Sequence, residues 1–115
     1  MSNVRGKKLE ICGMDPKTGW HRTGFCSTDA YDWGTHVVCA RVTKEFLEFT
    51  KSRGNDLSTP RPGFSGLKPG DKWCLCALRW LEAMKAGVAP PVDLDATNIS
   101  VLKYVDIKDL MRHAL

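Results

Sequence analysis

The chain has 115 residues, of which 43% are hydrophobic and 26% are charged, values ordinary for a globular protein with one core. Its 17 Lys and Arg residues exceed its 13 Asp and Glu residues, but they are scattered, which argues against a nucleic-acid-binding face. No stretch approaches the roughly 20 apolar residues that a membrane span requires. We therefore expect one domain over residues 1–115, with residues 1–8 flexible and with no nucleic-acid or membrane partner.

The cysteine content and the N-terminal sequence indicate the cellular compartment in which the protein resides. The first residues lack the continuous apolar segment of a secretory signal. Five cysteines are an odd number, which argues against a fully paired disulfide framework. Both observations predict a cytoplasmic protein in a reducing compartment, with free thiols or a metal site. The sequence leaves cofactors and the oligomeric state open.

The first half of the chain is rich in turn-forming residues and then becomes regular. The segment DPKTG at 15–19 predicts a turn, because proline fixes φ and glycine permits positive φ. Residues 20–26 suit a short strand. The β-branched segment 36–42 predicts a second strand, Thr43 is suited to cap the helix that follows, and Gly54 to close it.

The second half begins with a long polar loop over residues 55–71, where three prolines and three glycines exclude a regular element. Loops of this length in a compact domain are often functional. Alternation predicts a strand over 72–76, and helical spacing predicts a helix over 77–86 that ends at Gly87. Residues 92–96 suit a short edge strand.

The C-terminal segment offers two caps. Thr97 can cap a helical turn that reaches Tyr104, although residues 99–101 also suit a strand, and Asp106 can cap a last helix over 107–113. Two strands lead directly into helices, so we expect two strand-to-helix units side by side. The predicted fold class is α+β: a single small domain with about four short strands, two to three helices and a long irregular loop.

Five segments of the sequence carry a family resemblance: DPKTGW, HVVCARVTKEFLEF, KSRGNDLSTPRP, GLKPGDKWCLCALRW and AGVAPP. They resemble a family of uncharacterised proteins, domain of unknown function 2237, from about Val4 to the C-terminus. The resemblance is most specific over 55–60 and 66–80. The chain is shorter than the family pattern over 62–66, and it has Asn98 where the family often has histidine. The resemblance implies one domain and a bacterial-type protein that is not secreted.

Thiols form the first candidate site. Cys39 and Cys76 each end a predicted strand just before a helix, where the helix dipole favours a nucleophilic or metal-binding thiolate. Cys74 shares a strand face with Cys76, so the three sulfurs converge if the strands are neighbours. Asp32 and His36 can meet through the turn between them. The candidate catalytic residues are Cys39, Cys76, His36 and Asp32, although His36 and Cys39 lie on opposite strand faces.

The same cysteines allow two other interpretations. A structural zinc ion needs four ligands, and the chain lacks the C-x-x-C spacing typical of such sites, so we assign no metal ligands. The possible ligands are Cys12, Cys26, Cys39, Cys74, Cys76, His21 and His36. The other interpretation is that the cysteines are small buried hydrophobic residues.

The polar loop forms the second candidate site. Two arginines lie there near amide and hydroxyl groups, and arginine suits recognition of a carboxylate or phosphate. The candidate ligand-binding residues are Arg53, Asn55, Asp56, Ser58, Thr59, Arg61, Trp73 and Cys74. With Phe64 and Trp73 as walls, they predict a pocket for a small anionic ligand. The competing interpretation is a self-capping loop with Asx turns at Asn55 and Asp56.

No common catalytic motif occurs, so the sequence does not decide whether the protein is an enzyme. The leading interpretation is a cytoplasmic small-ligand-binding protein, and a thiol-dependent enzyme if its thiols are reactive. Its site lies where the 55–71 loop meets the strand ends at Cys39 and Cys76. The alternative is a non-enzymatic interaction module that uses exposed tryptophans and is stabilised by zinc held by Cys and His.

Overall fold

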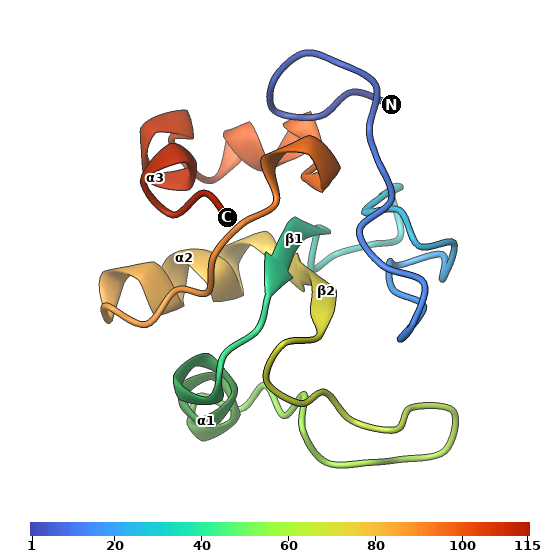
Figure 1. The fold of residues 1–115 in the computed structure, drawn as a ribbon, viewed down its shortest axis with the longest axis vertical. Helices are drawn as coiled ribbons and strands as arrows, with labels where there is room; N and C mark the ends of the chain where they lie inside the picture. The colour runs from blue at the N-terminus through green and yellow to red at the C-terminus, as the bar shows by residue number, and fades with distance from the viewer.

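All helices and strands lie after residue 35 in the computed structural model, which describes residues 1–115 (Figure 1). In chain order they are β1 (His36–Arg41), α1 (Lys44–Ser52), β2 (Lys72–Cys76), α2 (Ala77–Lys85), two 3-10 helices (Leu94–Ala96 and Ile99–Lys103) and α3 (Ile107–Arg112). The helices lie on one side of the two strands and residues 1–35 on the other (Figure 1). The fold is α+β, as predicted.

The two strands form one antiparallel sheet, so the two strand-to-helix units do lie side by side. In this register Cys39 lies opposite Cys74, and His36 lies opposite Cys76. A bulge interrupts the pairing between His36 and Val38. The first residue of β1 and the last residue of β2 therefore meet at one end of the sheet, next to the start of α2.

The prediction of about four strands is wrong, because two of the expected strands do not form. Residues 20–26 make turns, and Arg22 and Gly24 have φ values of 54° and 92°, which no strand accommodates. Val92 makes only isolated bridges, and the chain then enters the 3-10 helix Leu94–Ala96. Local composition favoured extended structure in both places, but turns and non-local contacts determine the backbone there.

Capping residues set most helix ends as predicted. Thr43 accepts a hydrogen bond from the backbone of the third residue of α1, and Gly54, with φ 94°, follows the end of that helix. Asp106 caps α3 in the same manner. The segment before α3 is helical, as expected, but Asn98 caps it instead of Thr97, whose hydroxyl bonds elsewhere.

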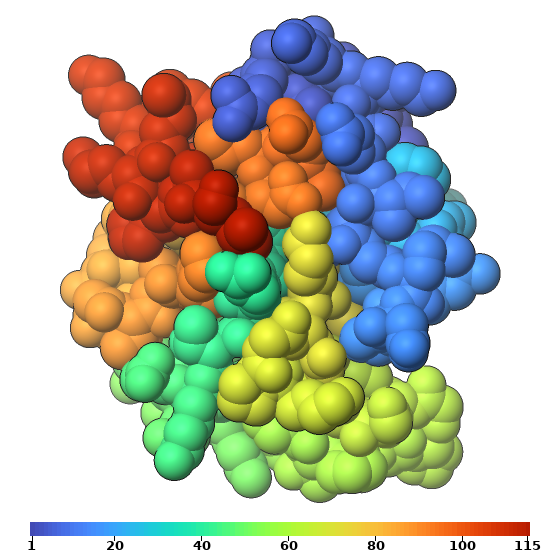
Figure 2. Space-filling view, viewed as in Figure 1, coloured from blue at the N-terminus to red at the C-terminus, as the bar shows by residue number.

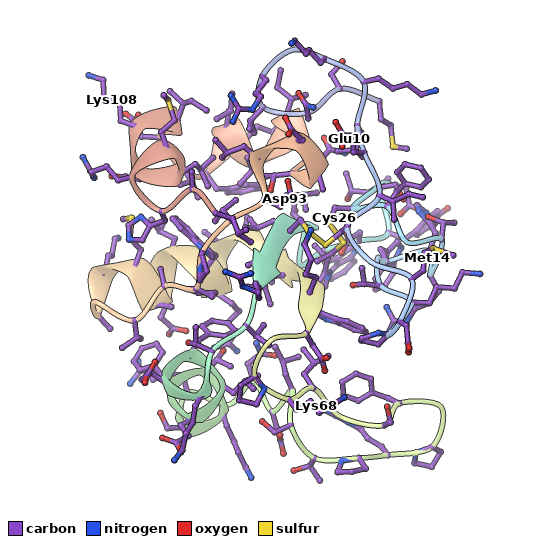
Figure 3. The ribbon with its side chains drawn as sticks, in the orientation of Figure 1. Glu10, Met14, Cys26, Lys68, Asp93 and Lys108 are labelled. Carbon is purple, nitrogen blue, oxygen red and sulfur yellow. A yellow bond between two sulfur atoms is a disulfide. The ribbon has the colours of Figure 1, made fainter.

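Two separate cores support these elements. The larger core lies between the sheet and the helices and contains 17 buried hydrophobic residues, the largest of which is Trp80. The smaller core consists of Ala96 and four cysteines, and it lies where residues 1–35 meet the sheet. Figure 3 shows its sulfur atoms beside the strands, around the label of Cys26. Two disulfides thus attach the N-terminal region to the sheet.

The first eight residues, which we expected to be flexible, lie against the 3-10 helices (Figure 2). Asn3 is buried, and its side-chain amide donates to the carbonyls of Lys8 and Asp95 at 3.3 and 3.0 Å. No helix of the structure combines the length and the apolar character that crossing a membrane demands.

Candidate functional site

The end of the sheet brings together a thiol, an imidazole and a carboxylate. Cys76 and His36 are direct partners across the two strands. Side chains at such positions have Cβ atoms about 4.5–5.5 Å apart. Asp32 lies behind the imidazole, with Oδ1 2.6 Å from His36 Nδ1. These are three of the four residues that the sequence indicated as catalytic, and the register places Cys76 opposite His36, whereas strand spacing placed Cys39 on the face opposite to that of His36.

Asp32 is held as a carboxylate. Its side chain is fully buried, and it accepts hydrogen bonds from the His36 backbone, the His36 ring and the Thr28 hydroxyl. Burial raises the pKa of Asp32, but these hydrogen bonds outweigh burial and hold the pKa below its ordinary value of 3.8. The carboxylate therefore keeps the proton of a neutral imidazole on Nδ1. His36 Nε2 is left as the basic nitrogen, which is the arrangement that general-base catalysis requires.

The ring of His36 is confined from two other sides. Trp20 stacks on it with ring centroids 5.8 Å apart and planes 10° apart. A Cβ atom at Gly34 would lie 2.5 Å from His36 Cε1, so only glycine leaves room for the ring in this position. Thr35, between them, has φ 48°, a left-handed conformation that is strained for a β-branched residue. The backbone before β1 is thus shaped around the imidazole.

Cys76 is the one cysteine without a disulfide partner, and it is partly exposed. It occupies the N-cap position of α2, and its side chain makes no capping hydrogen bond. The sulfur therefore lies at the positive end of the helix dipole, where a negative charge is stabilised. A nucleophile at this position has both a neighbouring base and an electrostatic partner for its anion.

A pocket of about 220 Å³ opens next to this cluster. Twelve residues line it, contributed by residues 19–22, the polar loop and the sheet. They are Gly19, Trp20, Arg22, His36, Asn55, Leu57, Arg61, Phe64, Trp73, Cys74, Leu75 and Cys76. The lining contains two arginines and no aspartate or glutamate, so the pocket favours an anionic ligand with an apolar body.

The two arginines are positioned by the aromatic walls of the pocket. The guanidinium of Arg22 lies 5.0 Å from the ring centroid of Trp73, and that of Arg61 lies 5.5 Å from Phe64. Arg22 also donates to the carbonyl of Gly19 at 2.6 Å, and Arg61 donates to a backbone carbonyl of the loop. Each guanidinium is thereby oriented and retains N–H groups for a carboxylate or phosphate.

Half of the predicted ligand-binding residues line the pocket, namely Asn55, Arg61, Trp73 and Cys74. Phe64 forms a wall, as expected. Arg53 instead pairs with Glu82 at 3.4 Å, on the outer surface of the helices.

Asp56, Ser58 and Thr59 lie outside the pocket and shape the loop. Asp56 accepts hydrogen bonds from the backbones of Ser58 and Thr59, both at 3.0 Å, which is the self-capping turn that the sequence offered as the competing interpretation. Hydrogen bonding from Thr59 lowers the pKa of Asp56 to about 2. A Cβ atom at Gly66 would lie 2.3 Å from the carbonyl oxygen of Ser58, so the two sides of the loop touch there.

The interpretation of Cys39 as a nucleophile is wrong in this structure. Its sulfur is bonded to that of Cys12, and the residue is fully buried. Cys26 and Cys74 form a second disulfide. The odd count of cysteines is explained by one free thiol, Cys76, beside two complete disulfides, so the expectation of free thiols is wrong for four of the five.

The disulfides also change the zinc interpretation, because a sulfur in a disulfide is not a thiolate ligand. His21, another possible ligand, is occupied by its neighbours: its ring hydrogen-bonds Ser27 and Asp29, both at 2.7 Å. The hydrogen bond to His21 lowers the pKa of Asp29. In the disulfide form, therefore, no four of the predicted ligands are free to bind a metal.

Sequence reasoning missed Trp20 and Arg22. Both belong to a segment without regular structure, where spacing gives no information about direction. The only signal was composition: a tryptophan, a histidine and an arginine directly follow the turn at 15–19. Arg22 has a left-handed backbone, with φ 54°, so the segment cannot continue as the strand that its composition suggested.

The comparisons with known proteins agree with the resemblance noted in the sequence. Residues 2–114 match the family described as "Uncharacterized protein conserved in bacteria (DUF2237)". Because the match spans nearly the whole chain, the protein belongs to this family. No protein with a curated description matches it.

Proposed function

We propose that this protein is a thiol-dependent enzyme that acts on a small anionic substrate. The observation that carries the proposal is the pairing of Cys76 with His36 across the sheet, with Asp32 hydrogen-bonded to the imidazole, at the edge of the pocket. A nucleophile, a base and a group that orients the base are the three parts of a covalent catalytic site.

In this mechanism His36 Nε2 accepts the proton of the Cys76 thiol, and the thiolate attacks an electrophilic carbon of the substrate. The charge on Asp32 stabilises the imidazolium, which then returns the proton to the leaving group. Arg22 and Arg61 bind the anionic group of the substrate, and Trp73 contacts its apolar part. Water can afterwards release the product, with the same imidazole as base.

Alkylation of Cys76 tests the nucleophile and its base. Iodoacetamide on the native disulfide form has one free thiol to modify, and mass spectrometry counts the additions. We expect His36→Gln to slow the reaction at neutral pH about tenfold or more, since general-base assistance is typically worth at least that factor. Gly34→Ala should slow it less, because the added methyl group displaces the same ring. Cys76→Ser is the control that takes up no label.

A charged reagent tests the pocket in the same assay. Iodoacetate carries a carboxylate, so the wild-type protein should prefer it over iodoacetamide, relative to a free thiol in solution. Arg22→Gln or Arg61→Gln should reduce this preference. Arg53→Gln is the matched control, because Arg53 lies outside the pocket. An unchanged rate in His36→Gln contradicts the catalytic pair, and an unchanged preference in the two pocket variants contradicts the anionic substrate.

One observation favours the interaction module as a second candidate. Tyr31 and Trp33 are 81% and 91% exposed, on the irregular segment that precedes β1. Large exposed aromatic residues are typical of interfaces. This role predicts association with a partner or a second copy, lost in Trp33→Ser, with the reactivity of Cys76 unchanged. Light scattering across a concentration series detects self-association.

A cytoplasmic location stays a prediction. Two disulfides are typical of oxidising compartments, whereas a cytoplasmic protein is usually kept reduced. Trapping the thiols with an alkylating reagent at the moment of cell lysis separates the two cases. Five labelled cysteines indicate a reducing compartment, and a single label on Cys76 indicates an oxidising one.

A further inference from the structure

The smaller core gathers four sulfur atoms in one place. The Sγ atoms of Cys12, Cys26 and Cys39 all lie within 4.8 Å of one another, and the Sγ atom of Cys74 is bonded to that of Cys26. All four cysteines are buried, and Ala96 is the only other member of this core. The two disulfides are therefore adjacent to each other in the interior of the protein (Figure 3).

Four converging cysteines are the donor set of a tetrahedral thiolate site. A zinc–sulfur bond of about 2.3 Å places the sulfurs of such a site about 3.8 Å apart. The sulfurs of Cys12, Cys26 and Cys39 lie within 4.8 Å of one another, and the bonded pair Cys12–Cys39, at 2.05 Å, has to separate to reach that spacing. When a disulfide is reduced, its two sulfurs separate from bonding distance to van der Waals contact, which moves each pair toward the same spacing.

We propose that the reduced chain binds one zinc-class divalent ion through Cys12, Cys26, Cys39 and Cys74. Reduction breaks two S–S bonds and consumes four electrons, which an external dithiol or phosphine supplies as it is oxidised. The four sulfurs take up protons and become thiols. The divalent ion then displaces these four protons and forms four metal–sulfur bonds without changing its own oxidation state.

The fold explains why the four ligands stay together after reduction. Cys39 and Cys74 are cross-strand partners, so the sheet holds them in place without a disulfide. Their backbone N–H groups are fixed as well, by donation to the hydroxyls of Thr97 at 3.1 Å and Thr18 at 2.9 Å. The other two ligands come from residues 1–35, which the ion would tie to the sheet in place of both disulfides.

This metal site shares Cys74 with the lining of the proposed catalytic pocket but does not use the candidate nucleophile, Cys76. Cys76 belongs to the pocket and is not a member of the sulfur core. The two proposals can therefore fail independently. The metal proposal concerns only the reduced chain, whereas the test of Cys76 described above uses the disulfide form.

Cobalt(II) is the direct probe of the site. The full chain is reduced with a phosphine under anaerobic conditions, desalted and titrated with Co²⁺. We expect one ion per chain and the visible bands of tetrahedral thiolate-bound cobalt, with zinc displacing the cobalt. Cys76→Ser is the matched control and should bind normally. Loss of the bands in Cys76→Ser, or their persistence in the double variant Cys12→Ser with Cys39→Ser, overturns the proposal.

Protection from alkylation keeps the proposal testable if those variants do not fold. In the reduced wild-type chain, zinc should slow the labelling of these four cysteines by iodoacetamide well below their rate in the zinc-free chain, whereas Cys76 should be labelled at the same rate with and without zinc. In urea the same zinc concentration should no longer shield them, because the fold brings the ligands together. Equal labelling with and without zinc, or equal shielding in urea, overturns the proposal.

Discussion

Residues 1–35 and residues 36–115 are stabilised in different ways. The second region contains every helix and strand and a core of 17 buried hydrophobic residues. The first region has neither a helix nor a strand, and of its hydrophobic residues Val4 alone packs against that core, at its margin. Two disulfides join the first region to the sheet, together with hydrogen bonds such as that from the Asn98 side chain to the carbonyl of Cys26. Hydrophobic burial supports one region and covalent cross-links support the other.

The candidate site lies at the boundary between these regions. Cys76 comes from the sheet, whereas Asp32, Trp20 and Arg22 come from the irregular region. A scaffold with a hydrophobic core thus carries Cys76, and a cross-linked segment carries the carboxylate next to His36 and one arginine of the pocket. Loops on a rigid scaffold often carry functional residues in this way. Changes that act on only one region should therefore separate stability from reactivity.

The largest expected loss of stability comes from a substitution in the hydrophobic core. Trp80 is fully buried, contacts His113 edge-on, and donates to the carbonyl of Pro90 at 3.1 Å. Trp80→Ala should lower the free energy of unfolding by about 3–5 kcal/mol. Urea unfolding followed by circular dichroism measures it. Leu78→Ala, at an exposed position of the same helix, is the control and should change stability by less than about 0.5 kcal/mol.

Removal of one disulfide should lower the free energy of unfolding by a similar amount, but the loss of structure should be concentrated in residues 1–35. The Cys26–Cys74 disulfide joins residues 48 apart in sequence, a separation worth about 4 kcal/mol in the chain-entropy account, often less in practice. The variant is Cys26→Ala with Cys74→Ala. We expect hydrogen exchange to accelerate most in residues 1–35, where the amide of Cys12 donates to the carbonyl of Gly24. Equal acceleration in α2 would show that the two regions are not separate.

The smallest expected effect is a dependence of stability on pH. Hydrogen bonds hold the pKa of Asp32 below its ordinary value of 3.8 in the folded protein. The unfolded chain therefore binds more protons as the pH falls through this range, and stability decreases with it. Above the ordinary value the contribution is complete. In Asp32→Asn this part of the pH dependence should be absent, and denaturant unfolding at a series of pH values from neutral to about pH 3 measures the difference.

The sequence predicted most of the second region, apart from the strand expected over 92–96 and the cap at Thr97, because its signals are local. Thr43, Gly54 and Asp106 act on the backbone next to them, and the hydrophobic pattern of the strands and helices reports which side is buried. The polar loop over residues 55–71 was also predicted in part. Its prolines and glycines excluded regular structure, and Arg61 and Asn55 do line the pocket.

The first region could not be predicted in this way, because non-local partners fix its structure. Nothing in the order of the cysteines shows that Cys12 pairs with Cys39 and Cys26 with Cys74. The register that pairs Cys76 with His36 depends on a bulge, which has no signature in the sequence around it. Trp20 was expected on a strand, but its direction follows from the turns on either side. The sequence nevertheless indicated Cys76, His36 and Asp32 as candidates, because chemistry limits which residue types can act as nucleophile and base, and their catalytic role stays a prediction.

The order of the cysteines has a consequence for the newly made chain. The two disulfides interleave, since Cys26 lies between Cys12 and Cys39 and the second disulfide reaches forward to Cys74. Neither can close on its partner until that partner has left the ribosome. A shorter-range pairing, Cys12 with Cys26 and Cys39 with Cys74, competes with the native one, because Cys39 and Cys74 are already neighbours across the sheet. The Cys12–Cys39 disulfide can therefore form before β2 has been made, whereas the Cys26–Cys74 disulfide has to wait until β2 has emerged.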